Sequence, residues 1–478
     1  MNIVFTDIIV DVGIHQIRVG VVENQKLVEL YIEEDNKEKT VGNIYRGIVK
    51  RILPGIQAAF IDIGKNKNAY LNLRENQFLG ENDQQLKQGD HITVQVQKEA
   101  MGSKGYKVTS HFSFAGKYCV LIPGEKSIGI SRKINDEKER LRLKELFNSL
   151  NLDNYGIIFR TNSLGKEEEE LIKEIQYLKN QCEVIKQKER YVKAPALLYK
   201  ELSFPFIAAR DLMTKEIRHF IINDKEMYEE ILAFLDLMDA SLKEKLVYKE
   251  EKNLFAYFLL ETQIERALSR HIWLKSGGMI IIDHTEALTV IDVNTAKYTG
   301  KKDMEKTILQ TNIEAAQEIA KQLRLRNIGG IIIIDFIDMK EEAHKEMLIK
   351  ILEEELKKDR VKTSIFGFTK LGLVELTRKK TGPSLTSLLL GKCPYCSGRG
   401  MVASVKFIAD KIAKEIDYIF TETIYNHITI EANKDIIHWF CSGDYSYQQA
   451  FEERYEKKLE FIENNQLAID QYKLIKKS

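Results

Sequence analysis

Cysteine and long apolar runs are both scarce in this sequence. Five cysteines among 478 residues exclude the disulfide framework that staples small secreted domains. No stretch approaches the roughly 18 uninterrupted apolar residues of a membrane-spanning helix. The first residues, "MNIVFTDIIVDVG", carry Asp7 and Asp11 and lack the basic-then-apolar order of a signal peptide. These absences predict a cytoplasmic protein without a membrane span.

An excess of charge of either sign is also missing. The 72 lysines and arginines balance 71 aspartates and glutamates, which leaves a net charge of +1. Composition therefore gives no argument for a nucleic-acid partner, and a polyanion would need a local basic surface. A hydrophobic content of 44% indicates an ample core. A chain of this length predicts two to four domains.

The N-terminal half alternates short strands with charged helices. Residues 1–35 contain strands that are too few to bury a core, so we expect them to join a sheet completed elsewhere. Residues 37–108 contain four or five short strands separated by glycine-containing turns, which is typical of a small Greek-key barrel. Residues 109–204 mix strands with a long charged helix. Its apolar residues follow one helical face, namely Leu171, Ile175, Leu178 and Cys182.

The C-terminal half has a different rhythm. Residues 205–275 read as mainly helical. From residue 277 onward the order is strand, turn, strand, long helix, strand, which is typical of an α/β unit with a largely parallel sheet. Residues 403–478 read as a small, charged α/β tail. The predicted fold class is therefore α/β with several domains.

Carboxylates stand at the ends of two strands of the α/β unit. The run "GGIIIIDFIDM" ends in Asp335 and Asp338, and the strand "ALTVIDVN" ends in Asp292 and Asn294. Functional crevices of open α/β sheets lie beyond the carboxyl ends of strands. Carboxylate oxygens there suit a hard cation such as Mg²⁺, which could polarise a phosphodiester. The competing interpretation is that these side chains cap the following turns, and the residues alone leave both open.

The sequence "CPYCSGRG" places Cys393 and Cys396 in a C-x-x-C knuckle. Two thiolates are half of the four ligands that a structural Zn²⁺ takes, and no second pair follows at a matching spacing. A redox dithiol or a metal shared by two chains would each account for the pair. The residues alone do not choose between them.

Three segments together resemble the catalytic region of the ribonuclease E/G family, endoribonucleases of bacterial RNA processing. They are "TVIDVNTAKYTG", "TNIEAAQEIAKQLRLRNIGGIIIIDFIDM" and "LTRKKTGPSL…CPYCSGRG", and the resemblance extends over nearly the whole chain. It implies a multidomain layout, in chain order: an RNase H-like subdomain (residues 1–36 with 205–267), an inserted S1 (OB-fold) barrel (37–108), a 5′-sensor region (109–204), a DNase I-like catalytic subdomain (268–389), a zinc-link (390–402) and a small C-terminal domain (403–478). The RNase H-like part lacks the acidic cluster of an active RNase H, so we expect it to be structural.

The resemblance also implies roles for the strand-end residues. Asp292 and Asp335 match the catalytic ligands of Mg²⁺ in the family. Asn294 matches an asparagine that supports the site by hydrogen bonding. Asp338 belongs to the same motif and is expected behind the two ligands.

Two RNA-binding surfaces are implied as well. Phe60 and Tyr70 match the base-stacking aromatics of the S1 barrel, with tyrosine at a position where we expect phenylalanine. From the residues alone, Phe60 in "AAFIDIG" reads as a buried core residue. Lys98 and Lys104 match basic residues of the RNA channel.

A pocket for a 5′-monophosphate is the second implied surface. It is formed by Arg160 and Thr161 with the backbone around Val120. An arginine binds phosphate with two parallel hydrogen bonds, and a threonine hydroxyl adds a third. The family usually continues with Ala-Gly, whereas this sequence has Asn162 and Ser163, so the resemblance supports Arg160 and Thr161 but does not fix the detailed shape of the loop.

The resemblance favours the shared-metal interpretation of the cysteine pair. It implies a Zn²⁺ held by Cys393 and Cys396 of two protomers, and hence a homodimer that could assemble into a tetramer. The expected function is that of a short, G-type member without the long C-terminal scaffold. It is an Mg²⁺-dependent endoribonuclease that cleaves single-stranded, AU-rich RNA in rRNA and tRNA processing and mRNA decay, prefers 5′-monophosphorylated substrates and leaves 5′-phosphate products. The alternatives are a non-catalytic RNA-binding or ribosome-assembly protein that uses the barrel, and a DNA nuclease.

Overall fold

The protein is described from a computed structural model that covers nine stretches of the chain. They are residues 5–34, 39–75, 86–100, 104–124, 126–150, 152–295, 304–396, 398–442 and 446–477. The chain divides into two compact units, Met1–Leu385 and Thr386–Ser478. Among the described residues, no helix has both the length and the apolar character needed to cross a membrane.

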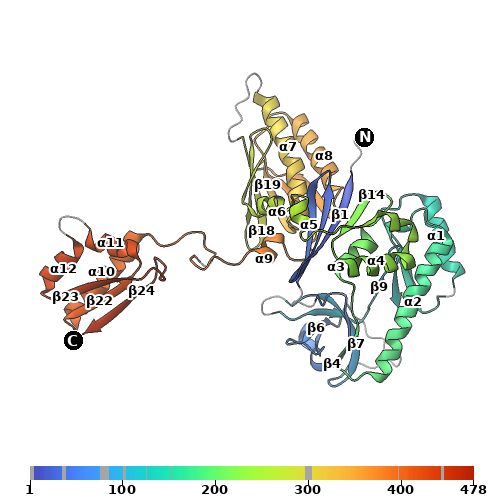
Figure 1. Cartoon of the computed structure of the whole chain (residues 1–478), viewed down its shortest axis with the longest axis horizontal. Helices are drawn as coiled ribbons and strands as arrows, with labels where there is room; N and C mark the ends of the chain where they lie inside the picture. The colour runs from blue at the N-terminus through green and yellow to red at the C-terminus, as the bar shows by residue number, and fades with distance from the viewer. Residues whose placement is uncertain are drawn as a thin grey trace. The chain divides into compact units, whose positions relative to one another are not determined.

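The first sheet of unit 1 joins the N-terminal strands to a later segment (Figure 1). Its order is β15 (Leu246–Tyr248), β14 (Ile217–Ile222), β1 (Thr6–Val12), β2 (Gln16–Glu23) and β3 (Lys26–Glu34). Alternate residues of β1 enter two cores. Ile8 and Val10 pack with α3 (Phe204–Asp211) and α4 (Lys225–Met238), whereas Ile9 packs with α5 (Leu254–Tyr257) and α6 (Glu261–Leu268). Helices on both faces explain why β1 is apolar without alternation.

A closed five-stranded barrel follows in the chain. Its strands are β4 (Ile44–Leu53), β5 (Ala58–Asp62), β6 (Ala69–Asn72), β8 (Lys107–Thr109) and β7 (His91–Lys98), and β7 closes the ring by pairing with β4. β13 (Ala196–Tyr199) adds to the other edge of β4. A Cβ on Gly47 would lie 2.4 Å from Ile61 Cγ2, so only glycine allows β4 to approach β5 here. The barrel is consistent with the expected OB-fold.

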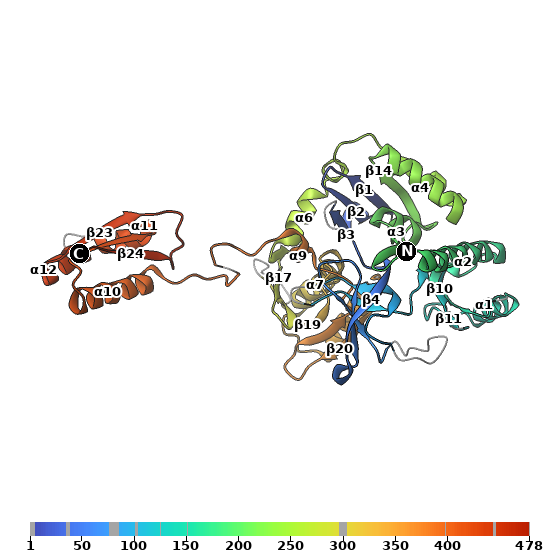
Figure 2. The same cartoon turned by 90° about the horizontal axis from the view of Figure 1, so that it is seen from below.

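A four-stranded sheet with two helices forms the next layer (Figure 2). Its order is β11 (Ile128–Ile130), β12 (Tyr155–Phe159), β10 (Cys119–Pro123) and β9 (Phe114–Ala115). The helices α1 (Glu137–Ser149) and α2 (Glu168–Tyr191) bury their apolar faces on it. The predicted face of α2 is confirmed, because Leu171, Ile175, Leu178 and Cys182 are all buried. The 3-10 helix η2 (Thr161–Ser163) follows β12.

The last sheet of unit 1 is mostly antiparallel, so the prediction of a largely parallel sheet was wrong. Its order is β16 (His271–Trp273), β17 (Met279–His284), β18 (Leu288–Asn294), β19 (Gly330–Asp335), β21 (Val374–Arg378) and β20 (Thr363–Phe368). Among the described strands of this sheet, β18 and β19 alone pair in parallel. β17 and β18 form a hairpin, and the long connection through α7 (Met304–Leu325) makes the parallel crossover from β18 to β19. α7 and α8 (Glu342–Leu356) pack on the sheet.

Unit 2 has a small core of its own. β22 (His427–Ala432) lies between β23 (Lys458–Glu463) and β24 (Tyr472–Lys477). The helices α10 (Val405–Glu422), α11 (Lys434–Cys441) and α12 (Tyr447–Tyr455) complete the unit. α9 (Leu385–Leu389) crosses the boundary between the units. The expected α/β character of residues 403–478 is therefore observed.

Candidate functional site

The two strand-end aspartates lie opposite each other on the parallel strand pair β18 and β19. β18 and β19 pair from Leu288 with Ile331 to Asp292 with Asp335. Directly opposed residues of neighbouring strands present their side chains to the same face. The register therefore brings Asp292 and Asp335 together at the carboxyl ends of their strands, as the sequence predicts.

Two asparagines fix the surroundings of this pair. Asn294 Nδ2 donates a hydrogen bond of 2.7 Å to Asp292 Oδ2. Asn312, fully buried on α7, makes two bonds with the backbone of Ile337: its Nδ2 donates to the carbonyl oxygen at 2.8 Å, and its Oδ1 accepts from the N–H at 3.1 Å. Ile337 lies between Asp335 and Asp338, so α7 holds the loop that carries both carboxylates.

The electrostatics of the pair suit a cation. Partial loss of hydration raises the pKa of the Asp335 carboxyl, and the negative charges of Asp292 and Asp338 raise it further. A bound cation would relieve this repulsion between carboxylates. Among the described residues no group of three or more His, Cys, Asp or Glu side chains forms a fuller metal cage. Two carboxylates nevertheless fit Mg²⁺, which takes one or two from a protein and fills its other positions with water and phosphate oxygens.

A row of aromatic and basic residues crosses the barrel. Phe60 on β5 opposes Tyr70 on β6, Tyr70 opposes Lys107 on β8, and Lys107 opposes Lys98 on β7. The rings of Phe60 and Tyr70 meet edge to face at 6.2 Å between centroids, and both side chains are half-buried. Phe60 therefore lies at the barrel surface, and its interpretation as a core residue was wrong. The reason is that Ala59 and Ile61, its neighbours in β5, take the core positions.

Basic residues flank the aromatic pair. Lys98 is exposed, Lys107 pairs with Glu75 at 2.8 Å, and Arg51 on β4 opposes Phe60. Lys104 is exposed shortly before β8. We call Arg51, Phe60, Tyr70, Lys107 and Lys98 the barrel row. A line of π-faces between cations can stack bases and hold phosphates of a single strand.

The predicted 5′-phosphate residues meet at the end of β12. Val120 on β10 opposes Ile158, and the Arg160 N–H donates to the Tyr118 carbonyl at 2.7 Å. The hydroxyl of Thr161 lies 3.0 Å from that of Ser131. The structure thus brings Val120, Arg160 and Thr161 to one end of the sheet. Asn162 and Ser163 continue into η2.

A buried glutamate orders the backbone before Val120. The carboxylate of Glu174 on α2 accepts backbone N–H bonds from Lys117, Tyr118 and Cys119 at 2.5, 2.8 and 2.9 Å. Burial raises the pKa of this carboxyl, although the three donors oppose the rise. A Cβ on Gly116 would lie 2.5 Å from the carboxyl carbon of Glu174, so the close approach requires glycine.

The cysteine pair belongs to unit 2. Cys396 Sγ accepts the Gly400 N–H at 3.4 Å, and hydrogen bonds from Gly400 and Gly398 lower the pKa of this thiol. Cys393 is exposed. Within the described part of the chain no further Cys, His or carboxylate joins them in a metal-binding group of three. The knuckle thus presents two soft ligands, half of a Zn²⁺ set.

Several of these residues were not found from the sequence. Lys107 and Arg51 enter the barrel row only through strand register. Glu174 is hidden in an acidic helix. Asn312 carries a signal, because it is a polar residue on the buried stripe of α7 between Thr311 and Ala315.

The geometry agrees with comparisons against known proteins. Residues 113–381 match the model of the "Ribonuclease E/G family". The chain is 39% identical to ribonuclease G of Escherichia coli (strain K12) over 425 residues, which is 86% of this chain and 87% of that protein. It is 38% identical to ribonuclease G of Haemophilus influenzae over 87% of each chain. Ribonuclease E of Escherichia coli (strain K12) is 37% identical over 84% of this chain and 39% of that protein. The chain therefore belongs to the ribonuclease E/G family and is similar to ribonuclease G.

Proposed function

We propose that the chain is an endoribonuclease that hydrolyses single-stranded RNA with Mg²⁺ held by Asp292 and Asp335. Family membership makes it an endoribonuclease. The observation that carries the metal assignment is the register that opposes Asp292 and Asp335 on adjacent parallel strands. Bound Mg²⁺ supplies Lewis acidity to the scissile phosphate and lowers the pKa of the attacking water.

The protein's own residues have distinct tasks in this proposal. Asn294 orients Asp292 through Oδ2 and leaves the other carboxylate oxygen for the metal. Asn312 keeps the loop after Asp335 in place. The barrel row stacks bases of the substrate, with Lys98 and Lys104 on its phosphates. Hydrolysis by water leaves the phosphate on the 5′ end of the downstream product.

We further assign Arg160, Thr161 and the Val120 backbone to the 5′-monophosphate of the substrate. An arginine fork and a hydroxyl at one sheet end are suited to a terminal phosphate, which carries more charge than an internal one. A preference for 5′-monophosphorylated RNA makes the enzyme act on already processed transcripts, in rRNA and tRNA maturation and mRNA decay. AU-rich single-stranded RNA suits the barrel row as a substrate, because stacking on the barrel requires unpaired bases.

In this proposal the layers of unit 1 follow the family layout. The first sheet is the RNase H-like subdomain, the barrel is the S1 domain, the four-stranded sheet is the 5′ sensor, and the last sheet is the DNase I-like subdomain. Residues 390–402 are the zinc-link and residues 403–478 the small domain.

An Mg²⁺-dependent cleavage assay tests the nuclease proposal. The substrate is one single-stranded oligoribonucleotide with either a 5′-monophosphate or a 5′-hydroxyl. We expect Asp335→Asn to abolish cleavage but keep RNA binding, and Arg160→Ala to remove only the monophosphate advantage. Asp283→Asn is the matched control, because Asp283 is an exposed carboxylate of the same sheet that pairs with Arg270.

Two outcomes would overturn the proposal. If wild type binds the RNA but does not cleave it with Mg²⁺ or Mn²⁺, the nuclease proposal is wrong and the non-catalytic RNA-binding function is supported instead. If DNA of the same sequence is cut as fast as RNA, the substrate class is wrong.

We also propose that Cys393 and Cys396 of two protomers share one Zn²⁺ and so link a homodimer. Half a site binds metal weakly, so dimerisation and metal binding depend on each other. Metal analysis with light scattering tests this: one Zn²⁺ per two chains and a dimer are expected, with both lost in Cys393→Ser and on chelation. A monomer that forms a Cys393–Cys396 disulfide under mild oxidation would point to the redox function instead.

A further inference from the structure

The guanidinium of Arg160 is held on one edge by protein groups. Its Nη1 donates to Asp211 Oδ1 at 2.6 Å and to the Gly116 carbonyl oxygen at 2.5 Å. Asp211 is the last residue of α3, and Gly116 lies between β9 and β10. Within the described part of the chain, the side-chain contacts of Arg160 all use Nη1, which leaves Nη2 and Nε for a ligand. Arg160 remains 29% exposed, so a ligand can reach it.

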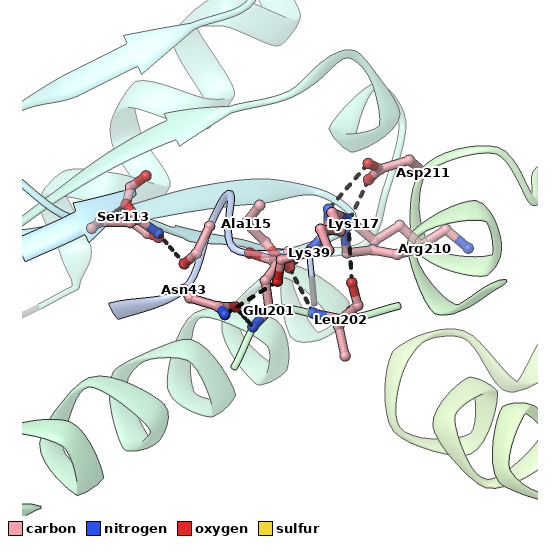
Figure 3. A network of polar contacts seen from close by, with 12 residues as sticks. Lys39, Asn43, Ser113, Ala115, Lys117, Glu201, Leu202, Arg210 and Asp211 are labelled. Atoms are coloured by element: carbon pink, nitrogen blue, oxygen red, sulfur yellow. Dashed lines mark hydrogen bonds and ion pairs between the residues drawn. The ribbon is translucent and has the colours of Figure 1, made fainter. Parts of the chain in front are cut away.

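Asp211 is itself fixed by a second arginine. Arg210 Nε donates to Asp211 Oδ1 at 3.0 Å, and Arg210 Nη2 donates to Oδ2 at 3.1 Å. Arg210 is buried and is anchored by Nη1 to the Ala115 carbonyl oxygen at 2.9 Å and to Glu201 at 3.4 Å (Figure 3). The carboxylate is therefore a rigid acceptor and not a mobile surface group.

The charge of Asp211 is balanced within this cluster. Arg160 and Arg210 both donate to Asp211, and Glu201 lies 3.4 Å from Arg210, so two guanidinium groups face two carboxylates. Burial alone would raise the pKa of the Asp211 carboxyl, but Arg210 and Arg160 outweigh it and lower that pKa. Asp211 is thus ionised at neutral pH, and Arg210 screens its charge from a phosphate bound on Arg160.

We infer that Asp211 is a positioning residue of the 5′-phosphate site, which holds the Nη1 edge of Arg160 so that Nη2 and Nε are presented to the terminal phosphate. The inference rests on the proposed 5′-monophosphate preference. A free arginine side chain must lose rotamer freedom when it binds phosphate, and an arginine already held by Asp211 and Gly116 has lost most of it before the substrate arrives. Asp211 contacts no substrate atom in this arrangement and acts through Arg160.

A binding assay tests Asp211 separately from cleavage. A 2′-O-methyl oligonucleotide carries either a 5′-monophosphate or a 5′-hydroxyl and is titrated without divalent metal, so that the proposed metal-dependent hydrolysis cannot occur. The readout is the dissociation constant of the 5′-hydroxyl form divided by that of the 5′-monophosphate form. It is measured for wild type, Asp211→Asn, Arg160→Ala and the double variant. Asp7→Asn is the control, because Asp7 is another carboxylate of unit 1 that pairs with an arginine, Arg218.

Asparagine keeps the shape of Asp211 but places a donor where the carboxylate accepts from Arg210. We expect the ratio in Asp211→Asn to fall about threefold to tenfold, with affinity for the 5′-hydroxyl form unchanged. In the Arg160→Ala background Asp211→Asn should change nothing, because the residue acts through Arg160. Asp211→Glu should recover part of the ratio, which a merely misfolded protein would not do.

The contrary results are distinct from one another. A ratio that stays the same or rises in Asp211→Asn would overturn the inference, since removal of a negative charge would then favour the phosphate. A further loss in the Arg160→Ala background would mean that Asp211 acts on the fold. If wild type itself shows no preference, the proposed 5′-phosphate function fails and this inference falls with it.

Discussion

Asn294 acts directly on one of the two proposed metal ligands. Its Nδ2 donates to Asp292 Oδ2 at 2.7 Å, which fixes the carboxylate plane. Groups that orient a metal ligand typically contribute about 10-fold to 100-fold in metal affinity or activity. Asn294→Ala should therefore shift the Mg²⁺ dependence of cleavage to higher concentration by about that factor and recover activity at saturating Mg²⁺. An unchanged Mg²⁺ titration would exclude this role.

Asn312 acts on the proposed metal-binding aspartates indirectly, through the backbone of Ile337. Asn312→Ala removes both bonds to the Ile337 backbone and leaves a partly buried N–H and carbonyl without these partners. We expect the free energy of unfolding to fall by about 1–3 kcal/mol. We also expect kcat to fall with RNA affinity unchanged, because the loop after Asp335 loses its anchor.

The neighbouring residue gives a matched control for Asn312. Thr311 is equally buried, but its hydroxyl bonds only to Thr307 within α7. Thr311→Val should keep kcat near wild type. Equal losses of kcat in Thr311→Val and Asn312→Ala would show that α7 packing matters and the link to Ile337 does not.

At the scale of elements, strand register decides which residues act together. The barrel row contains Lys107 because β8 pairs in parallel with β6 and antiparallel with β7. Lys107→Ala should weaken binding of single-stranded RNA several-fold. It should also reduce the slope of log affinity against log salt by about 1, since one phosphate contact is lost. Lys144→Ala, an exposed lysine on α1, is the control and should leave the slope unchanged.

The sequence predicts elements better than it predicts their pairing. The buried face of α2 follows from a helical spacing of apolar residues, and the end of β19 follows from the run of four isoleucines. The local residue pattern does not predict that β17 and β21 run antiparallel to their neighbours, because a strand buried on both faces is apolar whichever way it runs. Local evidence for antiparallel pairing comes from the short connections between β16 and β17, between β17 and β18, and between β20 and β21.

The residues of the candidate site also fall into two groups, those that the sequence predicts and those that only the structure shows. Asp292, Asp335 and Asn294 lie in a motif that can be recognised without a structure. Asp211, Lys107 and Asn312 work through contacts between residues far apart in the chain, and a side chain's partner there depends on register and packing. Phe60 shows the converse, because its apolar side chain suggests the core and only the alternation of β5 places it outside.

At the scale of the whole of unit 1, a buried ion pair joins the four-stranded sheet to the first sheet's helices. Lys117, between β9 and β10, lies 3.0 Å from Asp239 at the end of α4, and their side chains are only 4% and 5% exposed. Asp239 also accepts from the Tyr118 hydroxyl at 3.0 Å and from Ser241 Oγ at 2.5 Å. The layer that carries Arg160 and Val120 is thus fixed by charge as well as by packing.

Removal of this carboxylate should destabilise the protein in a pH-dependent way. Asp239→Asn leaves Lys117 buried without a counter-ion, so we expect the free energy of unfolding at pH 7 to fall by about 3–5 kcal/mol. Burial alone would raise the pKa of Asp239, but the bonds from Ser241, Lys117 and Tyr118 outweigh it and lower that pKa. A lowered carboxyl pKa contributes stability above the unfolded-state value, about 3.9, and that stability is lost as the pH falls through the folded-state value.

The expected difference between wild type and Asp239→Asn is therefore constant from pH 7 to about 5 and shrinks only below about 4. Urea unfolding at a series of pH values measures it. Asp153→Asn is the control, because Asp153 pairs with Lys126 in solvent, and its loss should change the free energy by no more than about 0.5 kcal/mol. A difference that is small at pH 7, or that persists unchanged in acid, would mean that apolar packing alone holds the two layers together. In that case the geometry around Arg160 would not depend on the Lys117–Asp239 pair.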